Sequence, residues 1–231
     1  MKPSRILYSL IAAAAILTGA TSCNSSNDDD FTQTYSDMFT ISSYTDQGMT
    51  LSYQTTAFGS SITALSPSFK FNPEQAPVGS RVMIAYRLPE GVEYGTPNAN
   101  ITIASAQKAY MDTLKVAPIK DYPGWDSHIV SSCYVWLTWP YLNTQTTSDF
   151  DPQKPVLNIL VDEGSIDGSG SAEAYLIIPQ TQGYNTQRGT IYTCTNLQQL
   201  RMSYPSLRSI SLHIPGGNKI EKISLYPEAQ S

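Results

Sequence analysis

The chain has 231 residues with 14 Lys or Arg against 19 Asp or Glu, which gives a formal net charge of −5. Only 14% of the residues are charged, which excludes coiled coils and long helical bundles because these are rich in charged helix formers. An acidic chain also lacks the basic surface that neutralises nucleic-acid phosphates, so we expect no nucleic-acid partner.

The first residues predict an export signal. Lys2 and Arg5 precede an apolar run over 6–17. This run is too short to cross roughly 30 Å of hydrocarbon as a helix. Small residues follow and lead directly to Cys23, an order typical of bacterial lipoproteins. We therefore predict a signal peptide over 1–22 and a lipid, palmitate included, on Cys23. An ordinary signal peptide with a nearby Cys is the alternative.

Residues 23–34 predict a flexible tether. They are rich in Ser, Asn and Asp and contain too little apolar surface to fold. Asp28–Asp30 resembles the acidic signal that sends lipoproteins to the cell surface in Bacteroidetes, although a solvated charge run is the alternative. We expect an outer-membrane protein, held by its lipid and exposed at the cell surface.

The remaining chain alternates apolar and polar residues with a period of two, which predicts an all-β fold. The predicted strands are 49–54, 81–88, 101–104, 131–139, 156–161, 172–178, 207–214 and 220–225. The strand 131–139 is apolar on both faces, which is typical of a central strand. Short helical turns are predicted over 104–114 and 195–203, the second with Thr195 as its N-cap.

A Pro- and Gly-rich segment over 116–124 predicts a domain boundary. It divides the mature chain into 35–116 and 117–231, and both lengths suit small β domains. A single continuous sandwich is the alternative.

Several short motifs resemble the NigD-like lipoproteins of Bacteroidetes. They are the acceptor at Cys23, the run Asp28–Asp30, the segment Val78–Tyr86 with its Gly-x-Arg-Val pattern, and Tyr141-Leu142-Asn143. The resemblance implies an N-terminal OB-like barrel followed by a C-terminal β-sandwich. The polar residues 144–148 depart from the family's usual strand after Tyr-Leu-Asn. The family implies no catalytic activity, so we expect no enzyme, no catalytic residues and no cofactor.

The cysteines other than Cys23 are Cys133 and Cys194. Export places them in an oxidising compartment, where a disulfide between them could form and persist. Two separately buried thiols are the alternative, because Cys is among the most buried residue types.

Aromatic residues concentrate near the middle of the chain. Trp125, Trp136, Trp139 and Tyr141 are candidates for a ligand-facing surface, since exposed rings stack on sugars or anchor a protein partner. A place in the hydrophobic core is the alternative.

The sequence offers one weak metal candidate. Asp162, Glu163 and Asp167 lie in a Gly- and Ser-rich stretch, and Ca²⁺ prefers several oxygens from a flexible loop. A solvated loop between two strands is the alternative.

These observations favour a non-enzymatic, NigD-like lipoprotein of the cell envelope that acts by binding or interaction. Its expected partners are the membrane, through Cys23, and an envelope protein or a glycan. The alternative is a glycan-binding accessory lipoprotein of a polysaccharide-uptake system.

Overall fold

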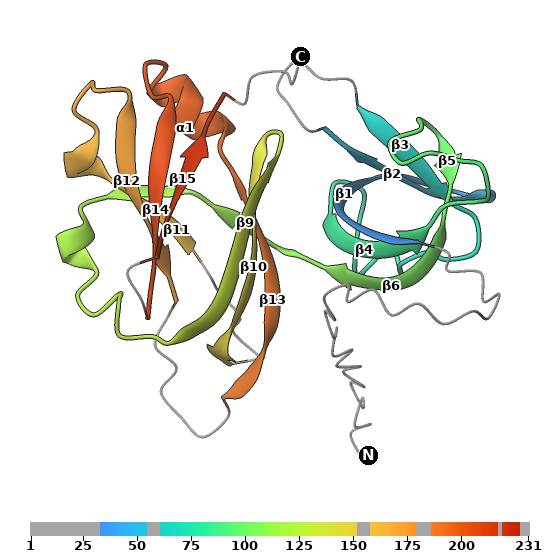
Figure 1. Ribbon diagram of the computed structural model, residues 1–231, viewed down its shortest axis with the longest axis horizontal. Coiled ribbons are helices and arrows are strands. Elements are labelled where there is room, and N and C mark those ends of the chain that lie inside the picture. Colours follow the sequence, from blue (N-terminus) through green and yellow to red (C-terminus); the bar gives the residue numbers. More distant parts are fainter. Residues whose placement is uncertain (1–32, 55–60, 152–157, 179–185, 217–218, 227–231) are drawn as a thin grey trace, which may run out of the picture. The chain divides into compact units, whose positions relative to one another are not determined.

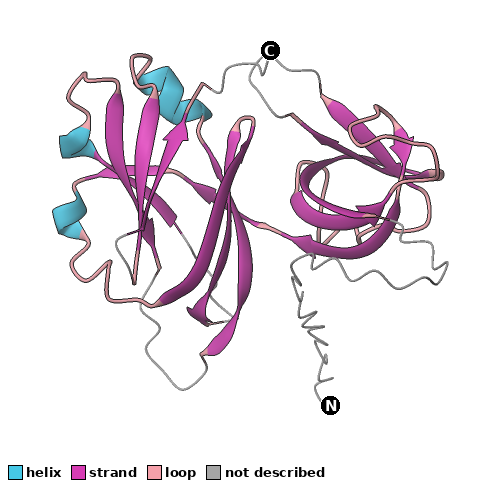
Figure 2. Ribbon diagram, viewed as in Figure 1, coloured by secondary structure: helices cyan, strands magenta, loops and turns pink. Residues whose placement is uncertain are grey.

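The structure is a computed structural model that describes residues 33–54, 61–151, 158–178, 186–216 and 219–226. The predicted signal peptide, Cys23 and nearly all of the predicted tether lie outside the described residues. Residues 32–231 form one compact unit. Strands dominate it, and the described helix is confined to two 3₁₀ turns and one short α-helix (Figure 2). The prediction of an all-β fold is confirmed.

Sheet A contains six strands in the order β5-β3-β2-β1-β4-β6 and curves into a half-barrel (Figure 1). Its strands are β1 (Thr34–Thr45), β2 (Gly48–Tyr53), β3 (Ile62–Ser66), β4 (Arg81–Arg87), β5 (Ala99–Asn100) and β6 (Thr102–Lys108). The period-two pattern places alternate side chains inside, so that Phe39, Ile41, Leu51, Val82 and Ile84 form a buried core.

The segment 99–108 pairs with strands at both ends of the order β3-β2-β1-β4 in sheet A. β5 and β6 are separated only by Ile101. β5 pairs in parallel with β3, and β6 pairs antiparallel with β4. The Ile101 N–H donates to the Leu65 carbonyl at 2.8 Å and continues the pairing with the end of β3. The segment 99–108 therefore links the two ends of the order β3-β2-β1-β4.

Sheets B and C are built from the rest of the described chain. Sheet B has the order β7-β13-β10-β9, and sheet C has the order β15-β14-β12-β11-β8. The strands of sheet B are β7 (Tyr110–Thr113), β9 (Val130–Thr138), β10 (Tyr141–Phe150) and β13 (Gln187–Asn196). Those of sheet C are β8 (Lys115–Ala117), β11 (Asn158–Asp162), β12 (Ser171–Ile177), β14 (Ser209–Ile214) and β15 (Lys219–Ser224). Both sheets bury side chains in one cluster, which includes Leu142 and Ile191 from sheet B and Leu176, Ile210 and Leu212 from sheet C.

Sheet membership changes at Ala109, between β6 and β7. β7 pairs in parallel with β13, and β8 pairs in parallel with β11. The Pro- and Gly-rich segment 116–124 contains the end of β8 and the 3₁₀ turn η1 (Ile119–Asp121). This segment therefore lies among the strands of sheets B and C rather than before them.

The helix predicted over 104–114 is wrong, because these residues form the strands β6 and β7. A short helix in the second predicted region is confirmed as α1 (Gln198–Ser203). Thr195 does not cap it, since its buried hydroxyl has no hydrogen-bond partner among the described residues. The Gln198 N–H instead donates to Asn196 Oδ1 at 2.8 Å.

The predicted central position of strand 131–139 is also wrong. Within the described residues β9 is an edge strand, and β10 lies between β9 and β13. The polar residues 144–148 belong to β10 and are largely buried. Their hydroxyls have cross-strand partners: Thr144 and Thr193 lie 2.6 Å apart, and Thr147 and Thr190 lie 3.0 Å apart. The segment that departs from the family pattern forms a strand because its neighbour supplies matching hydroxyls.

Candidate functional site

The outward face of sheet C carries a cluster of rings and one acid. Ala174 and Leu176 on β12 and Leu212 on β14 point into the core. The alternation of a strand therefore turns Tyr175 and His213 to the opposite face. The parallel pairing of the two strands sets Tyr175 directly opposite His213.

Ring contacts hold this cluster together. The rings of Tyr175 and His213 are stacked with centroids 4.7 Å apart and an interplanar angle of 11°. Trp125, from the segment between η1 and β9, contacts Tyr175 edge to face at 4.7 Å. It lies 6.3 Å from the His213 ring. We call Trp125, Glu173, Tyr175 and His213 the sheet C cluster.

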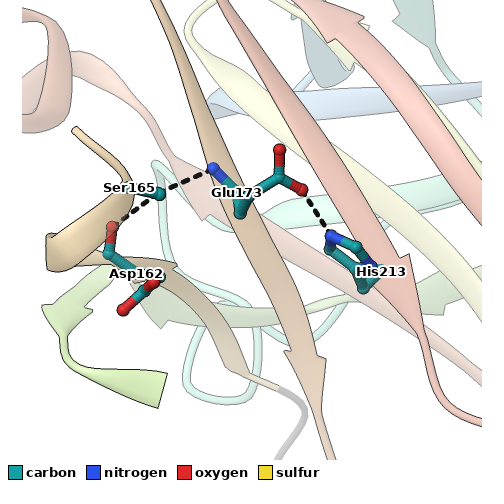
Figure 3. A network of polar contacts seen from close by, with 4 residues as sticks. All are labelled: Asp162, Ser165, Glu173 and His213. Carbon is teal, nitrogen blue, oxygen red and sulfur yellow. Dashed lines mark hydrogen bonds and ion pairs between the residues drawn. The ribbon is translucent and has the colours of Figure 1, made fainter. Parts of the chain in front are cut away.

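Glu173 supplies the acidic group of the sheet C cluster. Its carboxylate pairs with Nε2 of His213 (Figure 3). The Glu173 side chain is 42% exposed and the His213 side chain 25%, so the carboxylate remains accessible from solvent.

The loop beside Glu173 is fixed by a short polar network (Figure 3). The Ser165 hydroxyl donates to the Asp162 carbonyl at 2.7 Å and accepts the Glu173 N–H at 2.8 Å. The Asp162 carboxylate accepts the Ile119 N–H at 3.0 Å, which ties η1 to the end of β11. The network therefore anchors both β12 and the start of the segment that presents Trp125.

The surroundings of the Tyr175 hydroxyl favour its protonated form. Burial raises the pKa of Tyr175, and the nearby charges of Asp162 and Glu173 raise it further. The cluster thus offers apolar rings, a phenol and an accessible carboxylate. Such a surface can stack on an apolar ligand face and hydrogen-bond to hydroxyl groups.

A second aromatic and acidic cluster lies in sheet A. Tyr86 and Tyr94 donate to the two carboxylate oxygens of Asp37 at 2.8 Å and 3.0 Å, and Tyr53 donates to the Tyr94 hydroxyl at 3.1 Å. Tyr35 stacks on Tyr94 with centroids 5.0 Å apart. Burial and Asp37 raise the pKa values of Tyr86 and Tyr94.

Neither cluster was predicted as a unit. Tyr175 and His213 meet only because β12 and β14 pair in parallel. Asp37 and Tyr86 meet because β1 and β4 pair. The alternation in each strand predicted which residues face outward, but local spacing contains no information on which strands are neighbours.

The structure separates the four aromatic residues predicted to face a ligand. Trp125 belongs to the sheet C cluster. Trp136 packs on a small core with Met38 and Cys194. Trp139 is covered by the Arg201 guanidinium, 3.9 Å from its ring centroid. Tyr141 lies beneath the Arg81 guanidinium at 4.6 Å, so these four rings do not form one surface.

Two of the motifs that carry the family resemblance, Val78–Tyr86 and Tyr141-Leu142-Asn143, meet at Arg81. This residue is 1% exposed and donates to Thr40 Oγ1 at 2.8 Å, to Thr138 Oγ1 and to Asn143 Oδ1 at 3.2 Å. No described carboxylate forms an ion pair with it, and burial lowers the pKa of its guanidinium. Together with the stacking on Tyr141, these contacts join β4 of sheet A to β10 of sheet B.

The predicted disulfide is not formed in the structure. Cys133 and Cys194 are both buried thiols, and β10 lies between their strands. Two strand spacings separate the backbones by roughly 9–10 Å, whereas a disulfide requires Cα atoms within about 7 Å. Cys194 donates instead to Asn143 Oδ1 at 3.2 Å. Burial raises the pKa of this thiol, with Arg81 acting in the opposite direction.

The structure does not gather the weak calcium candidates into a site. Among the described residues, no group of three His, Cys, Asp or Glu is placed to hold a metal ion. Asp162 accepts the Ile119 N–H, and Asp167 accepts the Ser169 N–H within its own turn at 2.9 Å. These carboxylates stabilise the local backbone instead.

No protein-family profile matches the sequence, and no curated protein matches it. No helix among the described residues is long and apolar enough to cross a membrane.

Solved structures share the fold of this chain. A protein of unknown function from Bacteroides vulgatus is 16% identical with a TM-score of 0.61, and the match covers 86% of this chain and 92% of that one. A candidate lipoprotein from Bacteroides fragilis is 11% identical with a TM-score of 0.56, covering 85% and 100%. A NigD-like immunity protein from Bacteroides caccae is 18% identical with a TM-score of 0.50, covering 82% and 91%. The fold is therefore shared with a NigD-like protein, as the sequence motifs predicted.

Proposed function

We propose that the protein is a lipid-anchored component of the bacterial cell envelope that acts by binding a partner and not by catalysis. The observation that carries the proposal is the fold shared with a candidate lipoprotein and a NigD-like immunity protein. The export signal and Cys23 add the anchor. Ser165 lies in the polar network near His213, and a serine hydroxyl can act as a nucleophile. This hydroxyl is instead hydrogen-bonded to the backbone of Asp162 and Glu173. The arrangement therefore favours a fixed surface over acid–base chemistry.

We further propose that sheet A is an OB-like barrel and that sheets B and C form a β-sandwich. The barrel is supported by the segment 99–108, which pairs with β3 at one end and with β4 along the other. The sandwich is supported by the core cluster that both sheets share. The pairing of β7 and β8 favours a boundary at Ala109, earlier than the predicted division between 116 and 117.

The anchor is tested by metabolic labelling with a palmitate analogue. The wild-type chain should be labelled, and Cys23→Ala should not be, because the acceptor thiol is missing. Cys133→Ala is the matched control and should keep the label. Label on Cys23→Ala would exclude this anchor.

The binding role is tested by cross-linking the intact protein in cells and identifying the products by mass spectrometry. An envelope protein or an antibacterial peptide should be enriched over the Cys23→Ala variant, which cannot be held at the membrane. Equal recovery from both variants would contradict a binding role in the envelope.

The sheet C cluster favours glycan binding as a second candidate. Trp125, Tyr175 and Glu173 combine rings with an accessible carboxylate, and these groups suit the apolar face and the hydroxyls of a sugar ring. Affinity electrophoresis in gels containing starch, xylan or mannan tests this. Trp139→Ala is the control, because Arg201 covers the Trp139 ring in the wild type. At least one polysaccharide should retard the wild type and Trp139→Ala but not Trp125→Ala. Equal migration of all three proteins in every gel would exclude the glycan role of this cluster.

A further inference from the structure

Strand β9 forms an unusual edge of sheet B. Within the part of the chain that the structure describes, β9 pairs with β10 alone. None of its nine residues, Val130–Thr138, is charged or a proline. Edge strands present backbone N–H and C=O groups that template the addition of another strand.

The other described edge strands carry the features that normally prevent such pairing. β6 contains Lys108, β7 contains Asp112 and β15 contains Lys222. β5 and β8 have only two and three residues. Charge and short length are the usual protection of sheet edges. Among the described edges β9 is therefore distinguished by being both long and uncharged. Its pairing with β10 is irregular between Val130 and Ser132, so its regular part is 132–138.

Two further features mark the same edge. Tyr134, at the middle of β9, is 58% exposed, and Ile129, directly before the strand, is 77% exposed. A cavity of about 270 Å³ lies along the first half of β9, lined by 130–134 and completed by 214–216 at the end of β14. Gly216 packs against the backbone of 128–130, so an added strand would find its backbone edge from Ser131 onward, with the recess beside it.

We propose that β9 pairs antiparallel with β9 of a second copy of this chain, about a two-fold axis at Tyr134. A symmetric pair of this kind uses one patch twice and closes after two copies. An uncharged strand can face its own copy without bringing like charges together. The inference concerns self-association and stands independently of the proposed function.

The register about Tyr134 matches the faces of the two strands. Val135 and Leu137 pack on the core shared by sheets B and C, and cross-strand partners in an antiparallel pair lie on one face. Val135 of the second copy falls opposite Cys133, within the regular part of β9 and beside the cavity. The two Tyr134 rings face each other at the axis, where a cross-strand aromatic pair adds stability.

Cross-linking tests the register. Tyr134→Cys places two thiols opposite each other, with Cβ atoms roughly 4.5–5.5 Å apart. Mild oxidation of the full chain in detergent should therefore give a covalent dimer. Tyr110→Cys is the matched control, because it lies on the opposite edge strand of sheet B and is 42% exposed. Equal cross-linking of the two variants would overturn the proposal.

Sedimentation equilibrium tests the association itself. The full chain in density-matched detergent should form a dimer, and Tyr134→Lys should weaken it by about tenfold or more because a lysine on an edge strand opposes pairing. Tyr134→Phe should dimerise like the wild type. A wild-type protein that is monomeric at every concentration, or a dimer that Tyr134→Lys leaves intact, would overturn the proposal.

Discussion

The buried phenol of Tyr86 donates a hydrogen bond to the carboxylate of Asp37. Both burial and this hydrogen bond raise the pKa of Tyr86. A tyrosine in the unfolded chain ionises near pH 10. Because the pKa in the folded state lies above this value, the stabilisation from Tyr86 is complete below about pH 10 and is lost as the pH rises toward the folded pKa.

We therefore expect the free energy of unfolding to fall as the pH rises above about 10. Tyr86→Phe should fall less steeply, since it removes one of the responsible groups, and should lose about 1–2 kcal/mol at neutral pH with its hydrogen bond. Urea unfolding at a series of pH values measures both effects. A Tyr86→Phe slope equal to the wild-type slope would contradict this account.

At the scale of single elements, β10 is the strand that local composition describes least well. Thr144 and Thr146 are fully buried although they are polar. A buried hydroxyl is costly only when it has no partner, and Thr144 lies 2.6 Å from Thr193 on β13. The strand is therefore stable only with its neighbour in this register.

Thr144→Val should destabilise the protein by about 1–3 kcal/mol, because it leaves the Thr193 hydroxyl buried with fewer partners. The double variant Thr144→Val and Thr193→Val should cost less than the sum of the two single variants. Thermal or urea unfolding of the four proteins measures this coupling. Additive losses would show that the pair contributes nothing beyond its separate side chains.

The sequence predicted strands well wherever one face is buried, as in β2, β4 and β14, because the alternation of side chains is itself the signal. It also predicted β9 as a strand. The central position inferred from its two apolar faces was wrong, because β9 is an edge strand among the described residues. Part of its second face, at Trp136, packs on the small core with Met38 and Cys194. The alternation also could not show that Tyr175 would meet His213, since the pairing of strands distant in sequence is a property of the whole fold.

At the scale of the molecule, Arg81 links sheet A to sheet B. Its guanidinium contacts Thr40 on β1 as well as Thr138 at the end of β9 and Asn143 on β10. Met38, Ala109 and Cys194 form a small buried cluster. We expect these contacts to make the compact unit 32–231 unfold in one transition.

Arg81→Met should remove this coupling and cost roughly 2–4 kcal/mol, because several hydrogen bonds to a charged group are lost together. Fluorescence of the three Trp residues, all outside sheet A, and hydrogen exchange of sheet A amides should coincide in the wild type. In Arg81→Met the sheet A amides should exchange at lower urea. Arg87→Met, on the same strand but exposed, is the control. Coincident transitions in Arg81→Met would show that Arg81 does not couple the sheets.

Arg81 is buried against Tyr141 and Asn143, so the motifs by which similar proteins are recognised contribute to the interior of the fold. Arg81, Tyr141 and Asn143, which come from two of these motifs, form an internal joint between sheets A and B and not a binding surface. Two chains that share them can share an architecture and still recognise unrelated partners. The identity of a partner has to be sought in outward-facing residues such as Glu173 and Tyr134, which the motifs do not include.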